Sequence, residues 1–264
     1  MHGKSLFLLY TVVLLLASGI SEGYGIGSVP WGWRYMGQCD VPSPNERFIA
    51  VAAGIEHCLG LKSDGTIITW GSNSASECEV PSPNENFIAV AAGGWYSIGL
   101  KSDSTIVVWG LNREGQCDVP LPNSEFIDIA AGHSHSLGLK SDGTIVVWGS
   151  NREGLCDVPI PNEDYVDVAA GHSHTLGLKS DGSIIAWGSN WSGQCDVPSP
   201  NEDFIAVAAG LDHSLGLKSD GTIVAWGSNN EGECDVPAPN DNFVAVSAGG
   251  ERKIECKPPH VRLA

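Results

Sequence analysis

The amino-acid sequence predicts an all-β protein folded as a β-propeller of six blades with three strands each. A unit of 39 residues recurs along the chain, and a fixed period of that size indicates a solenoid, a propeller or an array. Each unit holds three strand-like runs and no helical periodicity. Small residues end the first run and tryptophan lies near the end of the third, a taper that suits the crowded axis and wide rim of a propeller. Six cysteines mark the period: Cys39, Cys78, Cys117, Cys156, Cys195 and Cys234.

The unit at residues 204–242 shows how the strands are assigned. FIAVAAG at 204–210 ends in small residues, HSLGLK at 213–218 places its leucines on one face, and TIVAWG at 222–227 is β-branched and aromatic. Asp220-Gly221 separates the last two runs and predicts a tight hairpin, because glycine adopts the positive φ that the turn requires. A proline-rich return, VPxPN, closes the unit. Three strands cannot bury both faces alone, so neighbouring units must stack.

Residues 1–23 have the features of a secretory signal peptide. Lys4 gives a basic start, Leu6–Ala17 is an apolar core, and small residues near Ser18 and Gly23 offer cleavage sites. The apolar run is short for a membrane span, although an uncleaved anchor is the alternative. We therefore expect a secreted or extracellular protein, periplasmic if the source is bacterial, with no membrane attachment after the signal is removed.

The two ends of the repeat array each hold part of a unit. Residues 26–39 match the back of a unit, and residues 243–247 match its first strand, followed by a degenerate second strand at 252–257. Joined, these parts make one composite blade, which closes the ring and removes the exposed edges of an open array. The chain from 24 to 257 is then one six-bladed domain with a tail at 258–264. A truncated seven-bladed ring is the alternative.

The repeat also resembles a known family. The pattern AAGxxHSLGLKSDGTIxxWGSNxxGQCDVP, as in residues 130–159 and 208–237, resembles the regulator of chromosome condensation repeat. Its three-stranded form is similar to the secreted β-lactamase inhibitor protein II propeller. The resemblance covers nearly all of residues 26–257 and implies a propeller that binds other proteins through its loop faces. Those relatives have seven blades, whereas this chain counts to six. Nuclear members act on a small GTPase and on chromatin, and a signal peptide argues against that role.

The charge balance restricts the class of partner. The formal net charge is −17, with 14 Lys and Arg against 31 Asp and Glu. Because no basic stripe is present, nucleic acid and anionic membranes are disfavoured as partners. Acidic residues cluster in the returns, as at 162–164 and 201–203, and form either a solubilising rim or a surface for a cationic partner. No phosphate-cradling loop or calcium-loop spacing occurs, so no cofactor and no metal are expected.

Two cysteines depart from the repeat, and one asparagine begins a candidate modification site. The six periodic cysteines are interpreted as small buried apolar residues, since equivalent points of a ring lie too far apart for disulfides. Cys58 and Cys256 replace a serine and a leucine in blades that adjoin in a closed ring, and we expect a disulfide across that seam. Asn190 opens the only N-glycosylation sequon, which can be used if the source is eukaryotic.

The candidate binding residues follow each repeated glycine. Three positions vary there, and because they connect the first and second strands, all six loops should gather at one end near the axis. A scaffold that binds through loops varies them, and Trp, Tyr and Arg are enriched at binding hot spots. Neutral drift in exposed turns is the alternative. The predicted partner-binding residues are Ile55, Glu56, Trp95, Tyr96, His133, His172, Leu211, Asp212, Glu251 and Arg252.

Two further groups are weaker candidates. The segments that follow the third strand also vary, as at 33–35, 112–114, 151–153 and 190–192, and form the runner-up binding face. A histidine recurs beside the variable loops and is interpreted as a structural hydrogen-bonding residue. With two additional histidines, His133 and His172, it could instead bind zinc or act as a pH switch. The recurring histidines are His57, His135, His174 and His213.

The sequence therefore predicts a monomeric, secreted, acidic module that binds a partner protein. Catalysis has little support, because no Ser/His/Asp arrangement stands outside the repeat. One alternative is an enzyme acting on a polysaccharide or lactone at the propeller mouth, with Glu56 and Asp212 as its carboxylates. Another is a regulator resembling guanine-nucleotide exchange factors, if the leader is not a signal.

Overall fold

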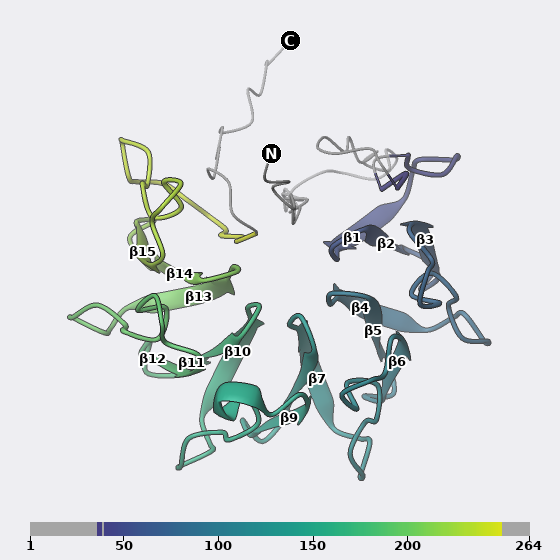
Figure 1. The fold of residues 1–264 in the computed structure, drawn as a ribbon, viewed down its shortest axis with the longest axis horizontal. Coiled ribbons are helices and arrows are strands. Elements are labelled where there is room, and N and C mark those ends of the chain that lie inside the picture. Colours follow the sequence, from purple (N-terminus) through teal and green to yellow (C-terminus); the bar gives the residue numbers. More distant parts are fainter. Residues whose placement is uncertain (1–35, 39, 250–264) are drawn as a thin grey trace, which may run out of the picture.

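The computed structural model describes residues 36–38 and 40–249 and contains five blades arranged around an axis (Figure 1). Each blade is an antiparallel sheet of three strands, so the all-β, three-stranded repeat is confirmed. A short 3-10 helix, η1 (Arg152–Gly154), follows the third blade. The strands are β1 (Phe48–Ala53), β2 (His57–Lys62) and β3 (Ile67–Gly71); β4 (Phe87–Ala92), β5 (Tyr96–Lys101) and β6 (Ile106–Gly110); β7 (Phe126–Ala131), β8 (His135–Lys140) and β9 (Ile145–Gly149); β10 (Tyr165–Ala170), β11 (His174–Lys179) and β12 (Ile184–Gly188); β13 (Phe204–Ala209), β14 (His213–Lys218) and β15 (Ile223–Gly227).

Within every blade the strands pair in the order in which they occur along the chain. In the first blade Phe48 pairs with Lys62 and Ala50 with Leu61, so a bulge lies at the second residue of the inner strand. The turn between the second and third strands has Gly65 at φ +79°. Ser104, which replaces this glycine in the second blade, is held at φ 65°, a conformation that is strained for a residue with a Cβ.

The hydrophobic core lies between blades rather than within them. One buried cluster joins Leu59 and Leu61 of β2 to Phe87 of β4, and the pattern repeats around the arc. A glycine on the second strand makes room for the aromatic ring that begins the same blade, since a Cβ on Gly60 would lie 2.2 Å from the Phe48 ring. The expectation that neighbouring units bury each other's faces is confirmed.

The returns tie each blade to the next. The indole Nε1 of Trp109 on β6 donates a hydrogen bond of 2.9 Å to the carbonyl of Glu77, which lies in the return of the preceding unit. The asparagine of VPxPN holds the start of the third strand, because Asn84 accepts from the amide of Ile67 and donates to its carbonyl, each at 2.8 Å. These contacts explain why tryptophan and asparagine recur once per unit.

The sixth unit differs from the sequence prediction. Residues 243–247 form no strand, although Phe243, Val246 and Ala248 pack against the core of the fifth blade. A strand needs a hydrogen-bonded neighbour, and the predicted neighbour at 252–257 lies outside the described residues. The described chain therefore shows five blades, and the six-bladed ring with its composite blade remains a prediction.

The five periodic cysteines that the structure describes are half-buried and form no disulfides. They are Cys78, Cys117, Cys156, Cys195 and Cys234. The thiol of Cys78 donates to the carbonyl of Ser72 at 3.1 Å, and its counterparts make equivalent bonds. They are therefore not the fully buried apolar residues expected. Burial raises the pKa of Cys117 and of Cys195 to about 11, so few of these thiols are ionised near neutral pH.

Alkylation of the native protein should therefore be slow at Cys117 and Cys195. At pH 8 iodoacetamide is expected to label both thiols at less than a tenth of the rate of a free cysteine, because the thiolate is the nucleophile. Peptide mass mapping after quenching measures this. The guanidinium-unfolded protein is the control and should label fully, whereas fast labelling of the native chain would contradict the burial argument.

Candidate functional site

The blades present two distinct ends, which we call the loop face and the turn face. The loop face contains the loops between first and second strands, residues 54–56 in the first blade, and the turn face contains the hairpins between second and third strands. The segment after the third strand also starts at the loop face, because Ser72 donates its amide to the carbonyl of Glu56 at 2.8 Å. The two variable surfaces expected separately are therefore neighbouring parts of one face.

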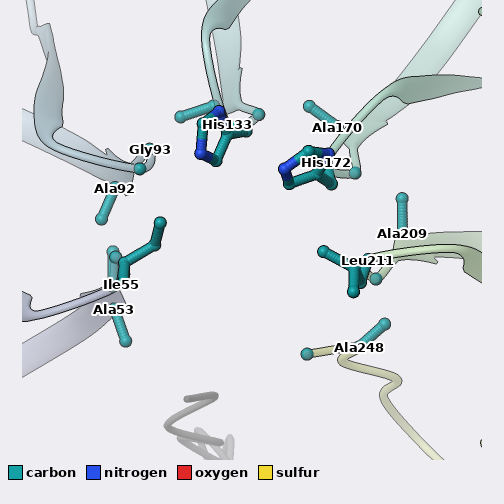
Figure 2. Close-up of a pocket in the computed structure, with 18 of the residues that line it drawn as sticks. Ala53, Ile55, Ala92, Gly93, His133, Ala170, His172, Ala209, Leu211 and Ala248 are labelled. Atoms are coloured by element: carbon teal, nitrogen blue, oxygen red, sulfur yellow. The ribbon is translucent and has the colours of Figure 1, made fainter. Parts of the chain in front are cut away.

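A cavity of about 260 Å³ lies on the axis and opens among these loops. Its wall is formed by the Ala-Ala-Gly ends of the inner strands, as the predicted taper requires. Hydrogen bonds join successive loops, from the amide of Ile55 to the carbonyl of Gly94 at 3.3 Å and from Gly94 to His133 at 3.2 Å. Ile55, His133, His172 and Leu211 are grouped around the opening (Figure 2).

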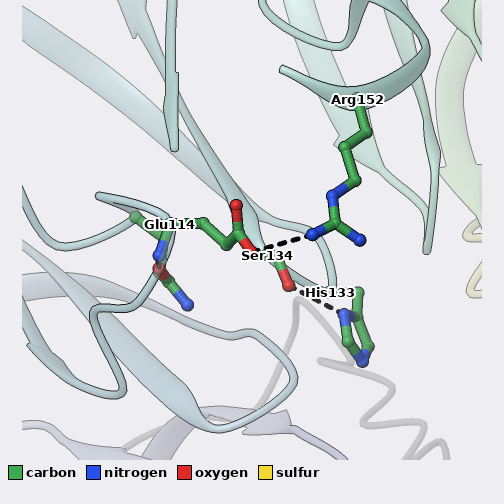
Figure 3. Close-up of polar contacts among 5 residues, drawn as sticks. Glu114, His133, Ser134 and Arg152 are labelled. Atoms are coloured by element: carbon green, nitrogen blue, oxygen red, sulfur yellow. Dashed lines mark hydrogen bonds and ion pairs between the residues drawn. The ribbon is translucent and has the colours of Figure 1, made fainter. Parts of the chain in front are cut away.

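Two imidazoles at the opening and one neighbouring indole form an aromatic cluster. The ring centroids of Trp95 and His133 lie 5.2 Å apart in an edge-to-face arrangement, and those of His133 and His172 lie 4.3 Å apart. Each imidazole shares its Nδ1 in a hydrogen bond with the hydroxyl of the next residue, Ser134 or Ser173 (Figure 3 shows the first pair). Burial lowers the pKa of His133 to about 4 and also lowers the pKa of His172. At neutral pH this cluster is therefore uncharged.

Tyr96 is a correction to the predicted site. It was expected in the loop, but it is the first residue of β5 and is fully buried. Its hydroxyl donates to the carbonyl of His135 in the next blade. The reason is its position in the repeat, because Tyr96 occupies the column that holds histidine in the other four described blades. A side chain in that column staples two blades and cannot contact a partner.

Three of the recurring histidines, His57, His135 and His174, are confirmed as structural hydrogen-bonding residues. The Nε2–H of His57 donates to the hydroxyl of Ser97 at 3.0 Å, and that hydroxyl donates to the carbonyl of Glu77 at 2.8 Å. His174 makes the same chain with Ser214 of the next blade. Burial lowers the pKa of both His57 and His174 to about 4. Among the described residues no three His, Cys, Asp or Glu side chains converge as metal ligands.

The remaining predicted residues are more scattered. Glu56 and Asp212 are half-buried and belong to the first and fifth blades, at the two ends of the described arc (Figure 1). The Asp212 carboxylate accepts a hydrogen bond from the side-chain Nε2 of Gln194 at 3.4 Å. The predicted Glu251 and Arg252 lie outside the described residues, so their places in the site stay predictions.

The edge of the loop face carries exposed charged and aromatic groups. Arg152 pairs with Glu114 of the preceding blade at 3.1 Å (Figure 3). Both side chains are exposed, so the pair adds at most about 1 kcal/mol of stability. Trp191, the middle residue of the sequon, is 86% exposed.

Asn190 and Cys58 are the two modification candidates. Asn190 is exposed, but its side chain already donates to Asp196 at 2.8 Å and accepts from the amide of Cys195 at 2.9 Å, so its repeated role is to brace the loop. Cys58 is buried with its sulfur 3.5 Å from the carbonyl of Gln38. Its expected partner Cys256 lies outside the described residues. Glycosylation and the disulfide both remain predictions.

Comparison with protein families agrees with this arrangement. The model of the regulator of chromosome condensation (RCC1) repeat matches residues 48–76, 87–116, 126–155, 165–194 and 204–233, one match in each blade. The chain belongs to the RCC1 repeat family. No curated protein matches the sequence.

Solved structures share the fold at low sequence identity. Yeast RCC1 (Prp20), in a complex with Kap60, has a TM-score of 0.66 and 20% identity, covering 79% of this chain and 67% of that one. A second Prp20p structure, from Saccharomyces cerevisiae, has a TM-score of 0.62 and 22% identity, covering 75% of this chain and 61% of that one. The ectodomain of the Arabidopsis thaliana receptor kinase ACR4 has a TM-score of 0.61 and 23% identity, covering 78% and 76%. This RCC1-repeat chain thus spans about two thirds of the length of Prp20. Among its described residues no helix is long and apolar enough to cross a membrane.

Sequence reasoning missed a pair of carboxylates in the RCC1 repeats of the third and fourth blades. Asp128 and Asp167 stand on neighbouring inner strands where the other units have alanine, and that break in the repeat was the available signal. Asp167 accepts from the amide of Val207 in the next blade at 3.2 Å. Burial raises the pKa of Asp167 to about 6, and the nearby charge of Asp128 adds to this effect.

Replacing Asp167 with alanine, the residue of four other repeats, should stabilise the protein at pH 7.5. The folded state holds the Asp167 proton more tightly than the unfolded chain, so ionisation near pH 6 opposes folding. We expect the free energy of unfolding to rise by about 1 kcal/mol at pH 7.5, once the loss of the Asp167 hydrogen bonds is included. At pH 5 it should rise by less or fall. Urea unfolding at both pH values measures it, with Asp128→Ala as the companion variant. An equal destabilisation at both pH values would show that the hydrogen bonds dominate.

Proposed function

We propose that this chain is a secreted, six-bladed RCC1-repeat propeller that binds a partner protein through its loop face. One observation carries the proposal. The loop residues that depart from the repeat, such as Ile55 and His172, are brought together around the axial opening, and Trp95 packs against this group. The residues of the repeat are used inside and between blades. The scaffold therefore holds a set of variable side chains in one place.

The chemistry of the loop face fits protein recognition. Its centre is apolar and aromatic, with Ile55, Leu211 and two neutral imidazoles at the opening and Trp95 packed against one of these imidazoles. Its edge is charged and exposed, as at Arg152. A desolvated centre with a polar rim is the usual anatomy of a protein interface, and tryptophan is the residue type most enriched at hot spots.

The related structures support this reading at the level of the fold. One Prp20 structure contains Kap60, and the other is described with binding properties to Gsp1p and histones. The plant receptor structure is an ectodomain, which is compatible with secretion of an RCC1-like propeller. The proposal for this chain includes cleavage of residues 1–23 and a monomeric mature domain.

Affinity capture with matched tryptophan variants tests the proposal. The mature chain, residues 24–264, is immobilised and exposed to secreted proteins of the source organism. We expect Trp95→Ala, and separately His133→Ala with His172→Ala, to reduce capture of a specific protein at least tenfold. Trp191→Ala, at the edge of the same face, is the matched control and should retain it. Unchanged capture by the two central variants, with native circular dichroism, would overturn the assignment of the loop face.

A further inference from the structure

We propose that the sixth blade takes its middle strand from a partner protein, and that this strand carries a glycine between two aliphatic residues. The proposal rests on the six-bladed ring proposed above, in which the two chain ends supply the first and third strands of the composite blade. The ring position between the fifth blade and the first has no described sheet (Figure 1). The place of the middle strand, beside residues 243–249, is here called the strand groove.

Residues 243–249 already occupy the position of an inner strand. The amide of Phe243 donates to the carbonyl of Gly221 at 3.0 Å, and the amide of Leu211 donates to the carbonyl of Gly249 at 3.2 Å. Both bonds repeat those that hold β13 to the fourth blade. The segment is therefore attached to the fifth blade at both of its ends, although it is not paired as a strand.

The outer edge of this segment is open. In the fifth blade Gly210 donates its amide to the carbonyl of His213 at 2.8 Å, and because bonded pairs alternate along an antiparallel ladder, every second residue before Gly210 faces β14. The counterparts of those residues are Ala245 and Ser247, and neither makes a backbone hydrogen bond to another described residue. Val244 between them is 80% exposed, against 41–56% in the five described blades. An unpaired edge is a template for a further strand.

The strand that pairs here must place glycine over the Phe243 ring. In every described blade the middle strand has glycine opposite the ring that begins the blade, and a Cβ on that glycine would lie 2.2–2.5 Å from the ring. These glycines are Gly60, Gly99, Gly138, Gly177 and Gly216. Phe243 is the corresponding ring of the sixth blade, so the same requirement applies to its middle strand.

The residues on either side of the glycine must be aliphatic. Leu59 and Leu61 of the first blade pack on Phe87 of the second, and the next three interfaces repeat this arrangement. The cluster around Phe48 of the first blade contains, among the described residues, only that blade and the return before it. An aliphatic pair from the middle strand of the sixth blade would complete this cluster.

A lysine after the aliphatic pair would also fit. The lysine that ends each middle strand lies 3.8–5.1 Å from the centre of the ring that begins the same blade. A cation over an aromatic face is a favourable arrangement. The groove is therefore matched by an extended segment of the type Ser-Leu-Gly-Leu-Lys.

The chain's own candidate for this strand does not meet these requirements. Residues 252–257, predicted as a degenerate second strand, place Glu255 in the glycine column and Lys253 in a column of small residues. A glutamate would overlap the Phe243 ring, and a lysine would bury its charge at high cost. The small-residue column is at most 2% exposed in the described blades, at Cys58, Ser97, Ser136, Thr175 and Ser214. A second copy of the chain offers the same segment, so we assign the groove to a different protein.

Fluorescence anisotropy with labelled peptides tests the strand groove on the mature chain, residues 24–264. The probe has the sequence of residues 211–220, which includes the middle strand of the fifth blade. The matched control peptide carries Gly216→Glu and so reproduces the misfit of Glu255. Two variants probe the edge of the groove. Ser247→Pro removes an edge amide, whereas Ser247→Ala restores the alanine of the five described blades.

A further variant gives the chain a fitting strand of its own. Lys253→Ser with Glu255→Gly restores the small residue and the glycine of the repeat. We expect this double variant to raise the melting temperature and to weaken peptide binding at least tenfold, because its own segment then competes for the groove.

We expect saturable binding of the glycine peptide to the wild type and to Ser247→Ala. Binding should weaken at least tenfold for the glutamate peptide and in Ser247→Pro. Equal binding of the two peptides would overturn the proposal, and so would a wild type that binds neither. A wild-type dimer in light scattering that the peptide dissociates would assign the groove to a second copy instead. Loss of peptide binding in Trp95→Ala would place the peptide on the loop face, and would overturn this proposal while the loop-face proposal stands.

Discussion

Acidification from pH 7.5 to pH 4 is expected to unfold the propeller. The buried histidines that staple the blades have their pKa lowered by burial, to about 3 for His135 and about 4 for His174. The unfolded chain binds protons near pH 6.5 and the folded chain does not, so stability falls as the pH drops through this window. For His174 alone the difference corresponds to about 3 kcal/mol. His57, His135 and His174 together contribute about 9 kcal/mol, which is comparable to the 5–15 kcal/mol that is usual for a domain. Protonation of Asp128 and Asp167, whose pKa is raised by burial, opposes them in part.

A tyrosine variant isolates the histidine effect. Tyr96 shows that tyrosine fits this column with a serine and a histidine on the facing blade, and His174 faces Ser214 and His213 in the same way. His174→Tyr should therefore remove about 2 kcal/mol of the stability difference between pH 7.5 and pH 5. Urea unfolding at the two pH values measures this, and Trp191→Ala, at a side chain that is 86% exposed, is a surface control. An unchanged pH dependence would show that His174 is not a source of acid sensitivity.

The repeat allowed most of the scaffold to be predicted. Asp-Gly fixed the hairpins, and the alternation of leucine with serine or glycine indicated which faces meet between blades. The common position of the two variable segments was not predicted, although it could be deduced from the sequence, because a blade of three strands ends its third strand where the first loop lies. That step requires following the strand directions rather than comparing residue types.

Other features of the site depend on contacts that a repeat pattern does not contain. Tyr96 was read by its residue type, as a hot-spot side chain, whereas its column in the repeat determines that it is buried. Asp128 and Asp167 were not predicted, because their burial and mutual charge depend on contacts between inner strands of neighbouring blades. The contact between His133 and His172 needs the angle between two blades. Closure of the ring depends on pairing between the two chain ends, which is the least local interaction in the molecule.

Gly132→Ala is expected to destabilise the protein by about 3 kcal/mol or more. A Cβ at this position would lie 2.1 Å from Cε1 of His135 and 2.7 Å from the carbonyl oxygen of Gly171. Glycine is required here because the His135 imidazole packs directly against it. That imidazole is hydrogen-bonded to Thr175 of the next blade at 3.1 Å. Overpacking in a core costs about 1–3 kcal/mol even when neighbours adjust, and here the adjustment would also break the bond between blades.

A second glycine and a double variant distinguish the steric clash of the added Cβ from the cost of an unfavourable backbone conformation. Gly115 has a positive φ, +80°, but a Cβ there would meet nothing closer than 3.5 Å, so Gly115→Ala should cost only about 1 kcal/mol. If the clash with His135 dominates at Gly132, then Gly132→Ala combined with His135→Ala should cost less than the sum of the single variants. Strict additivity in urea unfolding would instead assign the cost to the Gly171 carbonyl. In that case the close approach of neighbouring backbones at the axis, rather than the staple itself, determines why glycine recurs beside the binding loops.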